Sequence, residues 1–286
     1  MGKGKNKKKA RRERKSIPDR HILYSAAVQS VDADIDFFRR VYKTKRGRPF
    51  RRLREDFCGT AMLACDWVQR HKKNEAWGVD LDRATLDWGR EHYVPRLGKH
   101  AERLHLLLDD VLEVDTPPVD VVAALNFSYC VFKTRDQLRD YFSRVRSALR
   151  TGGIFFLDLF GGTEAICEGK EHRPIPAGKD FEGNRVPAFT YVWDQASFNP
   201  IDHRIVCHIH FKLKKGRAMR RAFTYDWRLW TIPELRELLT EAGFSETEVY
   251  LEGWDEEADD TDGIFRRRTR FENQEGWVAY VVGLAT

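Results

Sequence analysis

The first half of this 286-residue chain places acidic residues and a small-residue loop at regular intervals. The loop Cys58-Gly59-Thr60 follows Glu55 and opens onto a helical pattern, and a loop of this kind brings backbone N–H groups close to a ligand. About 20 residues further on, Asp80 occupies a position where a carboxylate can accept hydrogen bonds from both hydroxyls of a ribose. The segment Asp109-Asp110-Val111 offers an acceptor for an adenine amine. These residue types and spacings indicate a site that binds a nucleoside.

The elements that would position these residues alternate between strand-like and helix-like patterns. Strands are predicted over residues 53–57, 76–81, 104–108, 119–125 and 154–160, and helices over 61–70, 83–92 and 134–149. The run 119–125 is continuously apolar, as a strand buried on both faces of a parallel sheet requires. The candidate residues then follow successive strands, at the edge where α/β sheets bind ligands. The predicted fold class is α/β with a mostly parallel, Rossmann-like sheet.

The pattern changes after Gly161. Residues 161–187 are rich in Gly and Pro and are predicted to form a loop. Three runs then alternate with a period of two, over 189–197, 204–213 and 219–229. They predict an antiparallel β insertion within 161–230. A helix over 233–242 and two closing strands, over 248–251 and 277–282, complete the expected elements.

The arrangement resembles the class I S-adenosylmethionine-dependent methyltransferases, over residues 53–160 and again over 235–283. In that family the first loop commonly reads as an acid, two further residues and then C-G-T-G. Glu55 matches the acid and Cys58-Gly59-Thr60 matches the core, whereas Phe57 and Ala61 stand where glycines are usual. The G-x-G-x-x-G loop of nicotinamide dehydrogenases and the G-x-x-x-x-G-K-S/T loop of P-loop proteins are both absent from the sequence.

The resemblance implies S-adenosylmethionine as cofactor and an antiparallel strand at the C-terminal edge of the sheet. By the same likeness, Asp80 is the ribose-binding acid and Asp110 the adenine-side acid, with Asp109 as the alternative register. Tyr24 belongs to a region, 17–50, that often forms a helical lid in the family; the alternative for this side chain is simple packing. The predicted cofactor-binding residues are Glu55, Cys58, Gly59, Thr60, Asp80, Leu81, Asp109, Asp110, Val111, Asn126 and Tyr24.

The sequence indicates the catalytic and acceptor-binding residues less clearly than the cofactor-binding ones. Asn126 and Tyr129 lie where the family places residues that face the methyl group, and either could orient a nucleophile; the alternative is that they line the cofactor pocket or fill the core. The predicted substrate-binding residues are Tyr191, Trp193, Tyr225, Trp227 and Arg228. An aromatic box suits a cationic amine or a flat ring, and an arginine could pair with a carboxylate. Ordinary packing of the β insertion is the alternative for the aromatic residues, as is a surface or cofactor role for Arg228.

Charge is concentrated at the N-terminus. Residues 1–15 carry nine Lys or Arg and one Glu, a net charge of +8, whereas the whole chain has +6, so residues 16–286 sum to about −2. A nearly neutral body favours a small-molecule acceptor over RNA, although RNA contact through residues 1–16 stays an alternative. A methyltransferase-like interaction protein without activity is a further alternative. The expected domains are a basic tail (1–16), a helical lid (17–50) and a methyltransferase domain (51–286) whose β insertion caps the substrate.

Other features predict little chemistry. His208 and His210 supply half of a metal site at most, so no metal is expected. Five cysteines without a C-x-x-C pair argue against a disulfide framework. The acidic stretch 252–262 is expected to be a solvated loop, with steering of a cationic substrate as the alternative. The absence of a membrane-spanning run and of a secretory signal predicts a cytoplasmic protein, or a nuclear one if the source is eukaryotic.

Overall fold

The computed structural model describes residues 17–214, 216–255 and 260–286. The chain forms two compact units. The larger unit contains residues 30–167, 199–204 and 227–286, and the smaller one contains the described residues up to 29 together with 168–198 and 205–226. None of the described helices is long and apolar enough to cross a membrane. The predicted tail, residues 1–16, lies outside the described residues.

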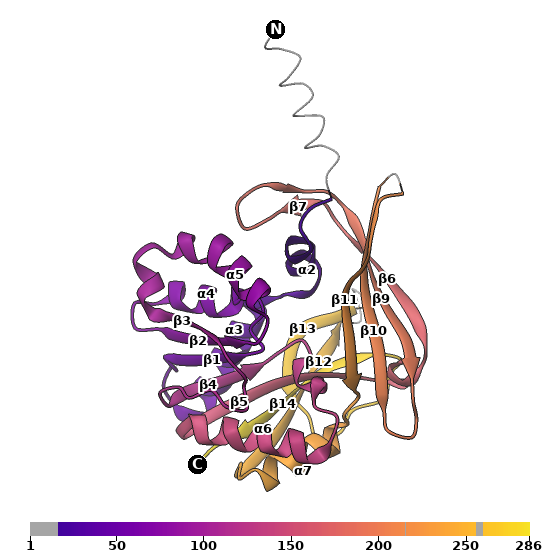
Figure 1. Cartoon of the computed structure of the whole chain (residues 1–286). Coiled ribbons are helices and arrows are strands. Elements are labelled where there is room, and N and C mark those ends of the chain that lie inside the picture. Colours follow the sequence, from indigo (N-terminus) through magenta and orange to yellow (C-terminus); the bar gives the residue numbers. More distant parts are fainter. Residues whose placement is uncertain (1–16, 215, 256–259) are drawn as a thin grey trace. The chain divides into compact units, whose positions relative to one another are not determined.

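The larger unit is built on an eight-stranded sheet with the order β13-β12-β14-β5-β4-β1-β2-β3 (Figure 1). Five strands run parallel: β1 (Arg52–Asp56), β2 (Glu75–Asp80), β3 (Leu104–Leu108), β4 (Val119–Ala124) and β5 (Leu149–Gly161). Three antiparallel strands extend the sheet beyond β5: β14 (Trp277–Leu284), β12 (Glu246–Asp255) and β13 (Asp260–Arg267). The predicted parallel strands and the antiparallel C-terminal strand are therefore confirmed.

Helices cover both faces of this sheet. Phe38 of α3 (Val31–Arg46) packs on Phe156 with ring centroids 4.4 Å apart, and Phe142 of α6 (Arg135–Ala148) packs on Phe155 at 5.7 Å. Since successive residues of a strand point to opposite faces, α3 and α6 lie on opposite faces of β5. Helix α4 (Met62–Arg70) packs beside α3, and α7 (Ile232–Glu241) packs beside α6. The remaining helical elements are α5 (Arg83–His92) and the 3-10 helices η1 (Val94–Arg103), η2 (Ser128–Val131) and η3 (Thr163–Ile166).

The smaller unit contains a four-stranded antiparallel sheet with the order β11-β10-β9-β6. Its strands are β6 (Gly169–Ile175), β9 (Phe189–Phe198), β10 (Arg204–Leu213) and β11 (Ala218–Arg228), beside a short hairpin of β7 (Gly178–Lys179) and β8 (Arg185–Val186). Leu23 and Ala27 of helix α2 (Arg20–Val28) pack into the same core as Phe189, Ile209 and Phe211. The three period-two runs are confirmed as β9, β10 and β11.

Two sequence-based expectations are wrong. Residues 161–187 are not a loop, because β6 pairs along its whole length with β9 and a hairpin follows it. Almost all of β6 is exposed, so this edge strand has no apolar alternation that a sequence pattern could reveal. Residues 252–262 are likewise not only a loop: β12 and β13 pair on either side of residues 256–259, which lie outside the described residues.

Candidate active site

The loop after β1 adopts backbone conformations that L-amino acids rarely take. Phe57, Gly59 and Ala61 have φ values of 56°, 56° and 59°, in the left-handed region that only glycine enters at little cost. The ring of Phe57 packs against Phe132 and Tyr141 of the α6 layer, with centroids 6.1 and 5.6 Å away. Packing against these two rings holds the bulky side chain of Phe57 in place. At Gly59, an added Cβ atom would meet only Thr85, at 3.8 Å.

The neighbouring strand end is strained in the same way. Asn126 and Phe127, just after β4, have φ values of 56° and 59°. Together with Phe57 and Ala61 they account for four of the six described non-glycine residues with positive φ. Strained backbone of this kind clusters at functional sites, because the surrounding structure must hold it in place. The carboxyl ends of β1 and β4, which are paired in the sheet, therefore mark the candidate site.

Asp80 connects the first loop to the end of β2. Its Oδ2 accepts a hydrogen bond from the Gly59 N–H at 2.7 Å, and its Oδ1 accepts one from the Asp82 N–H at 2.8 Å. Burial raises the pKa of the Asp80 carboxyl, although these N–H donors oppose the shift. Leu81 beside it leaves 66% of its surface exposed. A fixed carboxylate next to an exposed apolar side chain suits the ribose and base of a nucleoside.

Three further carboxylates lie near these strand ends, of which Glu55 and Asp158 are buried and Asp34 is partly buried. Glu55 accepts the Ala64 N–H at 2.9 Å, and Asp158 of β5 accepts the N–H groups of Asn126 and Phe127 at 2.8 and 2.9 Å. Asp34 of α3 accepts a hydrogen bond from the hydroxyl of Tyr280, which pairs with Asp158 across β14 and β5. We refer to Asp34, Glu55 and Asp158 as the carboxylate cluster.

The carboxylate cluster is electrostatically unusual. Burial raises the pKa of Asp34 to about 6, that of Asp158 to about 7 and that of Glu55 to about 8. The charge of Asp34 contributes to the increase at both other carboxyls, so the three groups interact. Within the described part of the chain, no Lys, Arg or His forms an ion pair with any of them. Buried acids without a cationic partner favour a cationic ligand.

The other predicted cofactor residues lie around these strand ends. Asp109 and Asp110 follow β3, where Asp109 Oδ1 accepts the Asp110 N–H at 2.8 Å and Asp110 Oδ1 accepts the Leu112 N–H at 2.9 Å. Cys58, Thr60 and Val111 are buried, and burial raises the pKa of the Cys58 thiol well above its usual value. These three residues therefore contribute shape and backbone groups. Leu81 and Asp109 are the exposed members of the set.

The two predicted catalytic residues differ in exposure. Asn126 is partly exposed, in the strained segment that Asp158 holds. Tyr129 is fully buried, its hydroxyl has no hydrogen-bond partner among the described residues, and burial raises its pKa well above the usual value. A tyrosine in this environment does not ionise near neutral pH. The structure therefore favours packing for Tyr129 and leaves Asn126 available to a ligand.

The predicted substrate set is divided between the two units. Trp193 stacks on Tyr225 in the smaller unit with centroids 6.2 Å apart, and Tyr191 lies in the apolar core of that unit. Tyr24 belongs to the same unit and packs on Phe223, at 4.9 Å.

Trp227 and Arg228, by contrast, belong to the larger unit. Arg228 pairs with Glu234 at 2.9 Å, donates to the Lys133 carbonyl at 3.2 Å and lies over the Trp230 ring. Its guanidinium is therefore engaged within the protein. Its predicted role toward a substrate carboxylate would require breaking these contacts.

The two histidines of β10 have ordinary polar partners. His208 Nδ1 lies 2.9 Å from the Thr224 hydroxyl, and His210 Nε2 lies 3.1 Å from Asp194, which also pairs with Lys170. The residues that the structure describes contain no group of three or more His, Cys, Asp or Glu side chains arranged to hold a metal ion.

Sequence reasoning missed four residues of this region. Asp158 is the only acid in the apolar run 154–160, a signal that could have identified it. Asp34 and Tyr280 come from opposite ends of the chain and leave no local pattern. Gly89 of α5 approaches the first loop so closely that an added Cβ would overlap the Thr60 carbonyl oxygen.

A Gly89→Ala variant should therefore push α5 away from the loop. We expect a stability loss of about 1–3 kcal/mol from overpacking, measured by chemical denaturation. We also expect affinity for S-adenosylhomocysteine to fall about tenfold, since displaced loop atoms bind poorly. Gly276→Ala is the matched control, because an added Cβ there meets nothing within 4 Å. Equal behaviour of the two variants would show that the contact with Thr60 does not shape the loop.

Comparison with known proteins agrees with this geometry. Residues 58–155 match the model of a methyltransferase domain. Among solved structures, CalS10, an amino pentose methyltransferase from Micromonospora echinaspora, is similar with a TM-score of 0.64 at 15% identity, covering 92% of this chain and 95% of that one. A S-adenosylmethionine-dependent methyltransferase from Clostridium acetobutylicum gives 0.63 at 15% identity, covering 92% and 97%.

The sugar N-methyltransferase KedS8 from Streptoalloteichus gives a TM-score of 0.56 at 18% identity, covering 93% of this chain and 92% of that one. A search of curated proteins found no match. The domain match, the strand order and the strained first loop lead to the same assignment. Residues 58–155 thus match a methyltransferase domain, and the chain has the fold of S-adenosylmethionine-dependent methyltransferases.

Proposed function

We propose that this protein transfers a methyl group from S-adenosylmethionine to a nitrogen or oxygen atom of a small-molecule acceptor. The carboxylate cluster carries this proposal, since three acids with raised pKa values and no cationic partner among the described residues suit a ligand with a sulfonium and an ammonium group. The similar proteins described as amino pentose and sugar N-methyltransferases support an acceptor of sugar type that bears an amine.

In this proposal the cofactor lies across the carboxyl ends of the parallel strands. Asp80 binds the ribose hydroxyls, Asp110 or Asp109 accepts from the adenine amine, and Leu81 covers the base. The strained loop from Phe57 to Ala61 brings its backbone against the ligand. The bound cofactor supplies an electrophilic methyl group on a positively charged sulfur. Asp34, Glu55 and Asp158 stabilise that positive charge.

The chain's own contribution to the reaction is then mainly positioning. Asn126 can accept a hydrogen bond from an acceptor amine or hydroxyl and direct its lone pair. An ammonium acceptor must lose a proton before it can react, and a carboxylate near its usual pKa is too weak a base for that step. Binding through Tyr191, Trp193, Tyr225, Trp227 and Arg228, and cofactor contact through Tyr24, stay predictions.

Cofactor binding should depend on pH through the carboxylate cluster. The pKa values of these acids are raised in the folded protein, so their contribution to stability is present at low pH and is lost as the pH rises through about 6 to 8. A bound cationic ligand, by contrast, favours the ionised carboxylates, so its binding strengthens as these acids lose their protons. Affinity for S-adenosylmethionine should therefore increase between pH 6 and pH 8, and binding should release protons.

Asp34→Asn tests this pH dependence. We expect about tenfold weaker binding of S-adenosylmethionine at pH 8 and a flatter pH profile, measured by calorimetry in buffers of different ionisation enthalpy. Asp36→Asn, on the same helix, is the control, because Asp36 is exposed and pairs with Arg39 and Arg70. If Asp34→Asn and Asp36→Asn bind alike, Asp34 plays no part in holding the positive charge.

Methyl transfer itself is tested with isotopically labelled S-adenosylmethionine and a panel of amino sugars, neutral sugars and RNA. Labelling of an amino sugar or a sugar hydroxyl supports the proposal. Labelling of RNA alone would identify a nucleic-acid acceptor instead. Tight cofactor binding without transfer to any acceptor class would support the reading as an inactive interaction protein.

A further inference from the structure

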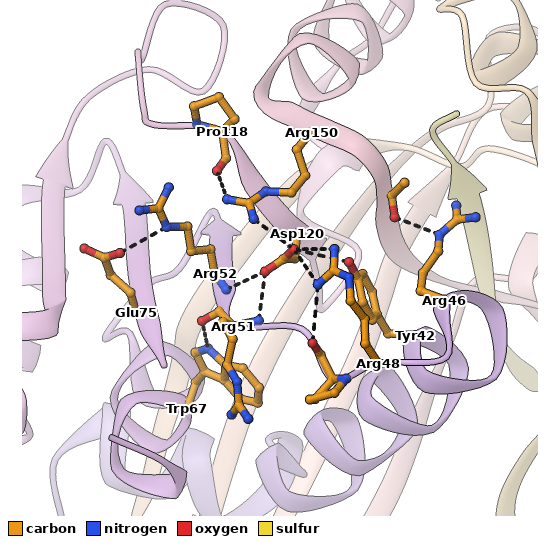
Figure 2. Close-up of polar contacts among 12 residues, drawn as sticks. Tyr42, Arg46, Arg48, Arg51, Arg52, Trp67, Glu75, Pro118, Asp120 and Arg150 are labelled. Carbon is orange, nitrogen blue, oxygen red and sulfur yellow. Dashed lines mark hydrogen bonds and ion pairs between the residues drawn. The ribbon is translucent and has the colours of Figure 1, made fainter. Parts of the chain in front are cut away.

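The amino-terminal ends of the parallel strands form a second charged region, at the opposite end of the sheet from the candidate active site. Basic residues precede or begin β1, β2, β3 and β5 at this end of the strands, and Figure 2 shows those around β1 and β5. We call this region the basic edge. Its cations are Arg46, Arg48, Arg51, Arg52, Lys72, Lys73, Arg103 and Arg150.

One buried carboxylate organises half of the basic edge. Asp120 is 1% exposed, and its Oδ2 accepts the backbone N–H groups of Arg51 and Arg52 at 2.8 and 3.0 Å. The guanidinium groups of Arg48 and Arg150 lie 3.3 and 3.4 Å from its Oδ1 (Figure 2). The pKa of Asp120 is lowered: its burial acts in the other direction, and the N–H donors and arginines outweigh it. A single negative charge thus fixes several arginines that keep much of their surface exposed.

The other half continues along the loop before β2. The Arg51 guanidinium donates to Asn74 at 2.9 Å, and Arg103 donates to the His71 carbonyl at 3.0 Å. The pKa of His71 is lowered, first by desolvation and then by the charges of Arg51, Lys73, Lys72 and Arg103. Arg51 and Arg103 therefore both hold the loop that precedes β2, and this loop also carries Lys72 and Lys73.

The basic edge has far more positive than negative charge. Among the residues that the structure describes, the carboxylates that contact its cations are Asp120 and Glu75, and Glu75 pairs with Arg52 at 3.3 Å. Side-chain exposure is 49% for Arg48, 40% for Arg52 and 35% for Arg150. A set of pre-positioned, partly exposed arginines that outnumber the carboxylates beside them is suited to phosphate groups, which accept two parallel N–H donors from one guanidinium.

We propose that the basic edge binds the phosphodiester backbone of a nucleic acid. Several phosphates at regular spacing match cations distributed along a whole sheet edge better than one small anion does. An anionic membrane surface fits less well, because none of the exposed large apolar side chains that the structure describes belongs to this edge. The sequence adds a further net charge of +8 in residues 1–15. This inference is independent of the methyl acceptor, since the basic edge and the strained loops lie at opposite ends of the strands.

The test uses the full chain and a fluorescent single-stranded RNA oligonucleotide. Lys72→Glu/Lys73→Glu is the informative variant, because both lysines are exposed and lie in a turn. We expect its affinity for RNA to fall at least about tenfold, and the slope of log affinity against log salt to decrease by about 1 to 2. Arg144→Glu/Lys212→Glu is the matched control, since it makes the same change in charge at exposed positions that are not part of the basic edge.

Three results would overturn the proposal. The first is equal RNA affinity of the two double variants, both verified as folded by thermal denaturation. The second is a loss of RNA binding on deletion of residues 1–15 with no effect of Lys72→Glu/Lys73→Glu, which would assign binding to the N-terminal segment alone. The third is preferential binding to vesicles containing phosphatidylserine, which would assign the edge to a membrane surface. Unchanged affinity for S-adenosylhomocysteine in Lys72→Glu/Lys73→Glu would show that the cofactor site is unaffected.

Discussion

An Asp80→Ala variant is expected to bind S-adenosylhomocysteine about 10- to 150-fold more weakly than the unaltered protein. The change removes the acceptor proposed for the ribose hydroxyls, and charged hydrogen bonds of this kind contribute about 1.5–3 kcal/mol. It also releases the Gly59 N–H, which Asp80 Oδ2 holds at 2.7 Å, so the first loop loses its tie to β2. Titration calorimetry measures the affinity directly.

Asp82→Ala provides the control for this prediction. Asp82 lies two residues away and caps α5 by accepting the Ala84 N–H at 2.9 Å. Its loss should cost about 1 kcal/mol of stability, as for other N-cap residues, with little effect on the nucleoside site. If both variants lose affinity equally, disturbance of α5 explains the result and the ribose assignment of Asp80 is wrong.

Asp158→Ala is expected to abolish methyl transfer and to cost about 2–4 kcal/mol of stability. The substitution leaves the N–H groups of Asn126 and Phe127 without their acceptor, in a segment where both residues have positive φ. That segment should then relax toward ordinary conformations and move Asn126 away from the acceptor. Denaturation curves and turnover with saturating cofactor measure the two effects separately. Asp158→Asn keeps one acceptor oxygen, so its stability and turnover should lie between those of Asp158→Ala and of the unaltered protein.

Asp120→Ala is the matched control for Asp158→Ala. Asp120 is also buried and also accepts two backbone N–H groups, but at the opposite end of the sheet. It should lose similar stability while the folded protein keeps its turnover. A similar loss of turnover in Asp120→Ala would show that general destabilisation, and not the position of Asn126, determines activity.

Local signals explain what could be predicted from the sequence. β3 and β4 are short, largely apolar runs, and Glu55 and Asp80 lie near the ends of β1 and β2, so strand prediction places the two acids at one edge of the sheet. Gly47 likewise ends α3 in the left-handed conformation that a glycine after a helix commonly adopts. Each of these features depends on residues that are close together in the chain.

The carboxylate cluster could not be predicted in this way. Asp34 precedes the sheet in the chain, Tyr280 lies in its last strand, and the two meet only because α3 packs across β5 and β14. For Tyr129 and Arg228, the sequence suggested a functional role that the structure does not favour. Their residue types suit catalysis or binding, but burial and existing partners engage them within the protein.

The charge of the carboxylate cluster also bears on what happens after transfer. Losing its methyl group converts the positively charged sulfur of the cofactor to a neutral thioether, so one favourable charge interaction with the site disappears with the reaction itself. The spent molecule should then be held less tightly than the fresh one. A carboxylate cluster with no cationic partner in the described part of the chain would in this way promote exchange of product for cofactor and reduce product inhibition in each turnover.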